Sequence, residues 1–202
     1  MYIPRTILRA KIGCNIGQWR HTNCSNDNMP ILHSTQLGTS ESPEDHVLHF
    51  PLGLPAFEDE TRFLPVERPG MEPIVFLQSL QRQDLAFPTL PVKALDPGFE
   101  LALTEDELAW LAGSSDALPA EAAVAIEDLI ALAIVTVSAD GITANLRAPV
   151  VVNQRTKLGI QAIQADSSYS LQHPVTAVPG TVSAHNEAAA NTGAAAAPRK
   201  DI

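Results

Sequence analysis

The stretch from Leu129 to Val137 constrains the fold more than any other part of this 202-residue sequence. It reads LIALAIVTV, is apolar apart from one threonine and is β-branched towards its end. An unbroken apolar run of this length is typical of a central strand that is covered on both faces. Asp140-Gly141 then signals a tight turn, and residues 142–146 alternate between apolar and polar, which predicts a β-hairpin.

Further short strand patterns recur on both sides of this hairpin. Residues 47–50 alternate in polarity, residues 74–77 form an apolar run, and residues 85–87 follow a polar turn. Residues 150–152 and 160–163 form a second predicted strand pair. Regularly spaced strands suggest an antiparallel sheet that is closed or half-closed into a barrel. The sequence therefore predicts a mainly β fold, a small antiparallel β-barrel-like single domain.

One or two short helices are expected within this domain. Thr104 and Glu107 form a capping box, in which each residue's side chain can bond the backbone of the other. Apolar residues follow at helical spacing, and Gly113 can end the helix. The composition of residues 119–128 favours a second short helix.

Charge divides the chain into three parts. Residues 1–28 carry four basic residues and one acid (+3), residues 29–174 carry seven and twenty (−13), and residues 175–202 carry two of each. We interpret residues 1–28 as an extension that is disordered or follows a mis-assigned start, since Met29 opens a more ordinary sequence. Residues 29–174 are the expected folded domain. The last part is rich in alanine and poor in large apolar residues, which predicts a disordered tail.

The composition and motifs exclude several functions. The acidic balance argues against binding along a phosphate backbone, and 5% aromatic residues are few for base stacking. No nucleophile elbow, phosphate-binding loop or dinucleotide fingerprint occurs, and no apolar run approaches the length of a membrane helix. Cys14, His21 and Cys24 match no common zinc spacing. We therefore expect no catalytic residues, no metal and no cofactor.

A rigid turn is expected where the first strand ends. Residues 50–58 read FPLGLPAFE and hold two prolines, one glycine and two phenylalanines. Proline fixes one backbone angle and glycine permits turns that other residues resist, so this segment can present Leu54 and Phe57 at fixed positions. The alternative is that both phenylalanines close one end of the barrel as core residues. We call residues 50–58 the signature turn.

The signature turn resembles the FPxGxPGFE motif of the FliW family of flagellar assembly factors. The similarity extends over about residues 31–174. Further blocks resemble the family in the same order, namely FLQS at 76–79, DLAF at 84–87, AIVTV at 133–137, TANLRAPVVVN at 143–153 and YSLQHP at 169–174.

Three positions depart from the family pattern. Ala56 stands where glycine is usual, so a different turn backbone is expected there. Pro88 replaces a β-branched residue, which is expected to weaken strand pairing because proline has no N–H. Phe99 stands where tyrosine is common.

The resemblance implies a non-enzymatic cytoplasmic protein without cofactors. Such proteins bind flagellin and also CsrA, an RNA-binding regulator that represses translation of flagellin mRNA, and they relieve that repression. The acidity of residues 29–174 is compatible with attraction to the basic surface expected on an RNA-binding protein. The residues expected to bind partners are Phe50, Pro51, Gly53, Pro55, Phe57, Glu58, Asp59, Asn145, Pro149 and Asn153.

Other interpretations stay open at this point. The glycine and prolines can simply set turns, the phenylalanines can pack, and the asparagines can cap strand ends. A nucleic-acid-binding small β-barrel is an alternative function, although the acidic domain counts against it. An enzyme whose site carries no known motif is another.

Overall fold

Strand β9 (Leu129–Ser138) organises the fold, as its sequence predicts. It pairs antiparallel with β7 (Ala86–Pro91), β10 (Gly141–Ala144) and β11 (Val150–Asn153). The remaining strands of this sheet are β4 (Leu48–His49), β5 (Arg62–Glu67), β6 (Val75–Ser79), β12 (Gly159–Gln161) and β13 (His173–Pro174). The computed structural model describes residues 7–12, 31–34, 38–41, 44–113, 124–165 and 168–176.

The sheet curves so that its two ends approach each other. Its strand order is β12–β11–β9–β7–β6–β5–β4, with β10 beside β9 and β13 beside β10, and every pairing along it is antiparallel. A single bridge joins His49 of β4 to Leu158 beside β12, and the His49 amide donates to the Lys157 carbonyl over 2.8 Å. The mainly β, antiparallel prediction is confirmed. The barrel-like shape comes from this one bridge rather than from a closed ladder.

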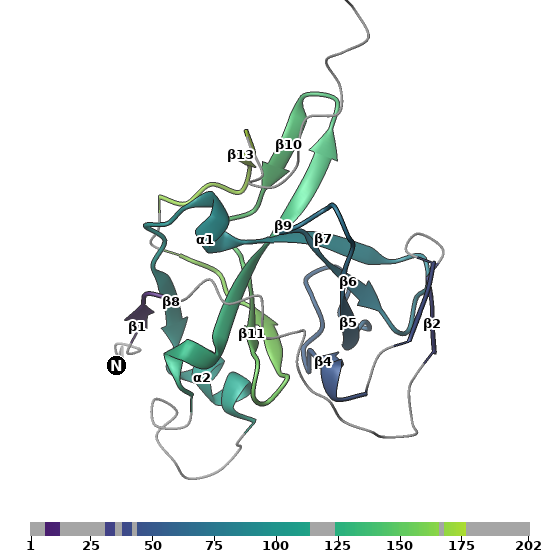
Figure 1. Cartoon of the computed structure of the whole chain (residues 1–202). Coiled ribbons are helices and arrows are strands. Elements are labelled where there is room, and N and C mark those ends of the chain that lie inside the picture. Colours follow the sequence, from purple (N-terminus) through teal and green to yellow (C-terminus); the bar gives the residue numbers. More distant parts are fainter. Residues whose placement is uncertain are drawn as a thin grey trace, which may run out of the picture.

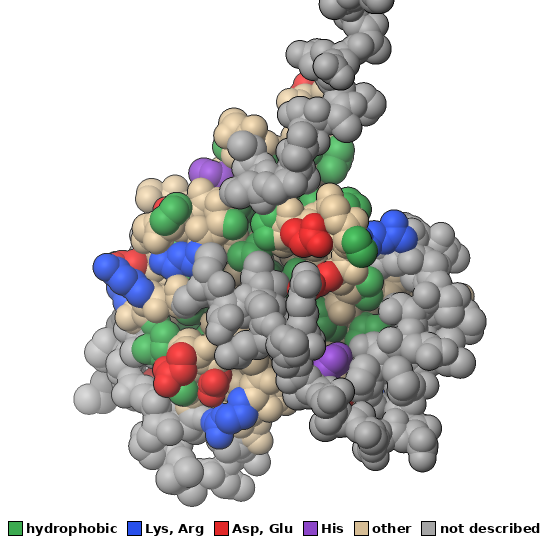
Figure 2. Space-filling view, in the orientation of Figure 1, with side chains coloured by type: hydrophobic (Ala, Val, Ile, Leu, Met, Phe, Trp, Pro, Cys, Tyr) green, Lys and Arg blue, Asp and Glu red, His purple; other side chains and the backbone are tan. Residues whose placement is uncertain are grey.

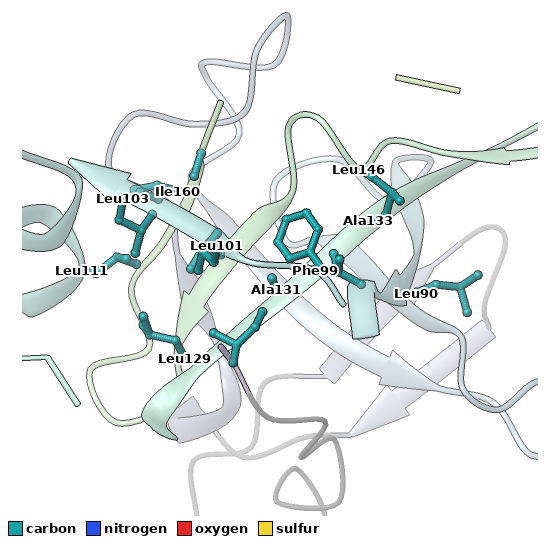
Figure 3. Close-up of a cluster of buried hydrophobic side chains, with 14 of the residues drawn as sticks. Leu90, Phe99, Leu101, Leu103, Leu111, Leu129, Ala131, Ala133, Leu146 and Ile160 are labelled. Carbon is teal, nitrogen blue, oxygen red and sulfur yellow. The ribbon is translucent and has the colours of Figure 1, made fainter. Parts of the chain in front are cut away.

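The apolar run in β9 serves two cores, one on each face. Ala131 and Ala133 pack into the main cluster, which also contains Phe99, whereas Ile130 and Leu132 pack into a second cluster. Figure 3 shows the Phe99 ring near the middle of the main cluster. Successive side chains of a strand point to opposite faces. A strand covered on both sides therefore needs an unbroken apolar sequence.

The end of β9 differs from the expected burial. Val137 is 72% exposed, and its cross-strand partner in β10, Ile142, is 44% exposed. The β9–β10 hairpin projects beyond the body of the domain (Figure 1), so its tip has no second layer to cover it. The prediction of a buried strand is right for the first part of β9 and wrong for its last residues.

The predicted capped helix forms as α2 (Glu105–Ala112). Thr104 and Glu107 make both hydrogen bonds of the capping box, and Gly113 ends the helix with a φ of 71°. A short helix that the sequence did not reveal, α1 (Val92–Leu95), follows β7 directly. Of the second predicted helix at 119–128, residues up to 123 lie outside the described residues. Its end forms a 3-10 helix, Ile126–Asp128.

Among the described residues, four strands lie outside the main sheet. β1 (Ile7–Ala10) pairs with β8 (Leu101–Thr104), and β2 (Ile31–Ser34) pairs with β3 (Gly38–Glu41). A 3-10 helix, Glu44–His46, precedes β4. β1 lies within residues 1–28, which the sequence placed outside the domain. The division at residue 28 stays a prediction. The part before residue 28 contains strand β1.

Two departures from the family pattern fit the sheet and core. Pro88 lies opposite Phe76 in the β6–β7 ladder, while the ladder from β7 to β9 begins one residue later, at Thr89. Pro88 thus takes part in the sheet without an N–H to donate, and the weaker strand pairing expected there stays a prediction. Phe99 is fully buried, and its ring centroid lies 4.3 Å from that of Tyr169. A phenylalanine therefore fills the main core here without needing a hydrogen-bond partner.

Candidate partner-binding site

The signature turn consists of two successive tight turns. The Gly53 amide donates to the Phe50 carbonyl over 2.9 Å, and the Phe57 amide donates to the Leu54 carbonyl over 2.7 Å. Leu54 is buried, whereas Pro51 and Pro55 are exposed. The segment is therefore anchored at Phe50 and at Gly53–Leu54, and residues 51–52 and 55–56 between and after these anchors are exposed to solvent.

Gly53 is required by its surroundings. Its φ is 64°, and a Cβ built on it would lie 2.5 Å from the Glu58 Cα. Ala56 also has a positive φ, of 69°, and follows Pro55 at the third position of the second turn. A proline followed by a positive φ is typical of a type II turn, which favours glycine at that position. Ala56 therefore adopts the backbone that favours glycine, and the different backbone expected there is not observed.

The two phenylalanines of the signature turn have different environments. Phe50 is fully buried, and its ring meets Phe63 edge-on with centroids 5.3 Å apart. A Cβ on Gly159 would lie 2.5 Å from the Phe50 ring, so the ring fills its space closely. Phe57 is half-buried and packs edge-on against Phe87, with centroids 5.1 Å apart. Phe50 thus fixes the turn from inside, and Phe57 lies at its margin.

The acidic run after the turn splits between surface and interior. Glu58 and Asp59 are exposed, whereas Glu60 is 5% exposed. The Ser79 hydroxyl donates to the Glu60 carboxylate, and the Arg82 Nε lies 3.8 Å from the same group. A buried carboxylate needs such partners to offset the loss of hydration. Glu60 therefore stabilises the structure, and Glu58 and Asp59 are the acids available to a partner.

Two of the three later predicted residues, Asn145 and Asn153, hold turns through their side chains. The Asn145 Oδ1 accepts from the Ala148 amide over 2.9 Å. Asn153 is fully buried: its Nδ2 donates to the Leu111 carbonyl over 3.1 Å, and its Oδ1 accepts from the Arg155 amide over 3.0 Å. Asn153 thus ties β11 to the last turn of α2. Pro149 is buried and immediately precedes β11.

An open cleft of about 450 Å³ separates the signature turn from α2. Leu52, on the signature turn, is 57% exposed, and Trp110, on α2, is 45% exposed. Glu58 and Asp106 add acids from the two walls, and both are exposed. Among the described residues that line the cleft there is no lysine or arginine. The cleft therefore combines apolar contact area with negative charge.

The structure brings together some of the predicted residues but not all of them. Gly53, Pro55 and Glu58 line the cleft, whereas Asn145 and Asn153 hold turns of their own. The α2 wall was missed. Trp110 falls between the buried Leu108 and Leu111, and a large aromatic off the buried stripe of a capped helix is the signal that could have revealed it.

Other kinds of site are not evident in the described part of the chain. No group of three or more His, Cys, Asp or Glu side chains is placed there to hold a metal ion. No helix among the described residues is long and apolar enough to cross a membrane. On the face shown in Figure 2, the acidic and basic side chains lie in small groups, and some of them adjoin side chains of opposite charge.

The family model for the FliW protein matches residues 31–175, which include the signature turn and α2. The chain belongs to the FliW family. Flagellar assembly factor FliW of Syntrophomonas wolfei is 34% identical over 144 residues, covering 70% of this chain and 86% of the relative. That of Bacillus licheniformis is 36% identical over 149 residues, covering 72% and 96%.

A solved structure supports the same assignment. The crystal structure of a flagellar assembly factor FliW superposes with a TM-score of 0.61 at 27% identity, covering 72% of this chain and 96% of that chain. The family domain therefore contains β8 and the whole cleft. β1 lies before its first matched residue.

Proposed function

We propose that this FliW-family chain is a non-enzymatic cytoplasmic regulator that binds flagellin and the RNA-binding protein CsrA. By binding CsrA, this chain relieves repression of flagellin mRNA translation. Flagellin competes with CsrA for binding to this chain. The observation that carries the proposal is the cleft between the signature turn and α2, which is lined by apolar and acidic side chains.

Charge supports a basic partner. Residues 29–174 have a net charge of −13, and Glu58 and Asp106 place part of it at the cleft. A surface that binds RNA carries Lys and Arg, so acidic and basic surfaces attract each other and increase the rate of encounter. The attraction weakens as salt shortens the Debye length.

A charge reversal at Glu58 tests the proposal. We expect Glu58→Arg to lower the affinity of the full chain for CsrA in calorimetry at low salt, because it places a cation beside a basic partner. Asp140→Arg is the matched control, since Asp140 is an exposed acid in the distant β9–β10 turn. A folded Glu58→Arg chain that binds CsrA as tightly as the control contradicts a role for Glu58.

The alternative of direct nucleic-acid binding has a separate test. A gel shift with flagellin mRNA at low salt is expected to show no complex with this chain alone. Tight binding of the mRNA would contradict the proposed function. A pull-down from cells with and without flagellar secretion should recover CsrA in the first case and flagellin in the second.

A further inference from the structure

The short strand β8 has two edges with different kinds of partner. On one edge, the Ala102 amide donates to the Gln164 Oε1 over 2.8 Å, and the Gln164 Nε2 donates to the Ala102 carbonyl over 3.1 Å. The Glu100 amide donates to the Tyr169 hydroxyl over 2.8 Å. Gln164 is 2% exposed. This edge is therefore closed by fixed side chains of the domain itself.

The other edge of β8 is occupied by β1. Alternate residues of a strand direct their backbone groups to opposite edges. The backbone N–H and C=O groups of Leu101 and Leu103 therefore point away from Gln164. They lie opposite Ala10 and Leu8 of β1 in the antiparallel register. Figure 1 shows β1 as a separate arrow beside β8, at the margin of the domain. The backbone pairing of this edge thus depends on a strand from the N-terminal part of the chain.

The segment that fills the edge has a regular chemical pattern. Arg9 and Lys11 are exposed, whereas Ala10 and Ile12 are 5% and 4% exposed. Ile12 belongs to the main hydrophobic cluster. Basic residues therefore point outward and apolar residues inward, with the two-residue period of an edge strand.

Two acidic residues lie in the same cleft as Arg9 of this segment. Arg9 lines a cleft of about 250 Å³ together with Glu100 and Glu107. Thr104 and Glu107 also line the larger cleft beside the signature turn. The two clefts therefore share a wall, and the edge of β8 continues the acidic and apolar surface that we assign to partner binding.

β1 comes from a part of the sequence that the family model does not cover, unlike the other residues of this surface. The family model begins at residue 31 and so contains β8 but not β1. β1 is four residues long, and residues 13–30 connect it to β2. An open strand edge is a template for pairing with another extended chain. A short strand on such an edge can be replaced by a competitor of the same chemistry.

We propose that the β8 edge is an exchangeable docking site. β1 occupies it in cis, and an extended partner segment with alternating basic and apolar residues replaces β1 in trans. The identity of that partner as CsrA rests on the proposed function, whereas the exchange itself does not. Because only the fraction of chains with an open edge can bind, β1 lowers the apparent affinity for the partner by that fraction.

A reversible lock on β1 tests the exchange. Arg9 and Ala102 are register partners, and directly opposed Cα atoms in antiparallel strands lie about 4.5 to 5.5 Å apart, within the range of a disulfide. The full chain would carry Arg9→Cys and Ala102→Cys, with Cys14→Ser and Cys24→Ser to remove other thiols. The probe is a fluorescent peptide with the sequence of residues 5–13, RTILRAKIG.

We expect the reduced chain to bind the probe at least about tenfold more tightly than the oxidised chain, because the disulfide removes the open state. Ile12→Asp in the otherwise unchanged chain should bind it at least about tenfold more tightly than wild type, since it releases β1. A peptide with glutamate at its three basic positions should not bind. Equal affinity of the oxidised and reduced chains overturns the proposal, whether or not Ile12→Asp folds.

The same locked chain separates this proposal from the proposed function. If CsrA binds the reduced chain and not the oxidised one, the partner uses the β8 edge. If CsrA binds both forms equally, the edge is not its docking site, and the proposed function stands. If CsrA binds neither form nor the wild-type chain, the proposed function fails, while the peptide result still decides whether the edge exchanges.

Discussion

Two substitutions in the signature turn should change stability in opposite directions. Gly53→Ala places a Cβ in a backbone with a φ of 64°, 2.5 Å from the Glu58 Cα. A left-handed alanine costs about 1–2 kcal/mol, and displacing packed backbone adds about 1–3 kcal/mol. We therefore expect the free energy of unfolding to fall by about 2–5 kcal/mol. Ala56→Gly relieves the same backbone strain at an exposed position and should raise it by up to about 1 kcal/mol.

Urea unfolding followed by circular dichroism measures both effects. An unchanged slope with a shifted midpoint assigns the change to stability rather than to a different unfolded state. Because Gly53 lines the cleft, Gly53→Ala should also weaken partner binding, whereas Ala56→Gly should not. A cost below about 0.5 kcal/mol for Gly53→Ala, typical of a neutral surface change, would refute the reasoning. So would a lower stability of Ala56→Gly.

Further predictions concern the polar contacts of the domain. Asn153→Ala leaves a buried carbonyl of Leu111 with one fewer donor and should cost about 1–3 kcal/mol in urea unfolding; a change within error would contradict its tying role. Glu60→Ala removes the acceptor of the buried Ser79 hydroxyl and should cost a similar amount of about 1–3 kcal/mol, whereas Asp59→Ala, at an exposed position, should change stability by less than about 0.5 kcal/mol. Equal effects of these two carboxylate deletions would refute the division between interior and surface acids. Raising the salt concentration should weaken CsrA binding to wild type more than to Glu58→Arg.

The sequence predicts the parts of the fold that depend on local patterns. The β9–β10 hairpin and the capping box of α2 follow from apolar runs, a turn dipeptide and the Thr104–Glu107 pair. Burial at the tip of β9 could not be predicted in this way, because a pattern shows which face is apolar but not whether another layer covers it. Val137 is exposed because no second layer covers the hairpin tip.

The candidate site was predictable on one wall only. The signature turn is recognisable because the backbone of a tight turn favours glycine and proline, so these residues mark it in the sequence. The position of Trp110 off the buried stripe of α2 marks it as a candidate, but the α2 wall depends on contacts between segments distant in the sequence. The sequence therefore does not show that Trp110 and Asp106 line the same cleft as Glu58. Basic and apolar residues alternate at positions 9–12 of the sequence, but this pattern does not show that β8 is the pairing partner.

The most direct test of partner binding at this cleft is a calorimetric titration of CsrA into two variants of the full chain. Trp110→Ala removes the apolar side chain of the α2 wall, and Val137→Ala removes an exposed side chain from the distant hairpin tip. An aromatic residue at the centre of an interface contributes about 2 kcal/mol or more. We predict that Trp110→Ala weakens binding at least about tenfold, while Val137→Ala leaves it unchanged. Equal affinities of the two variants would contradict binding at the cleft.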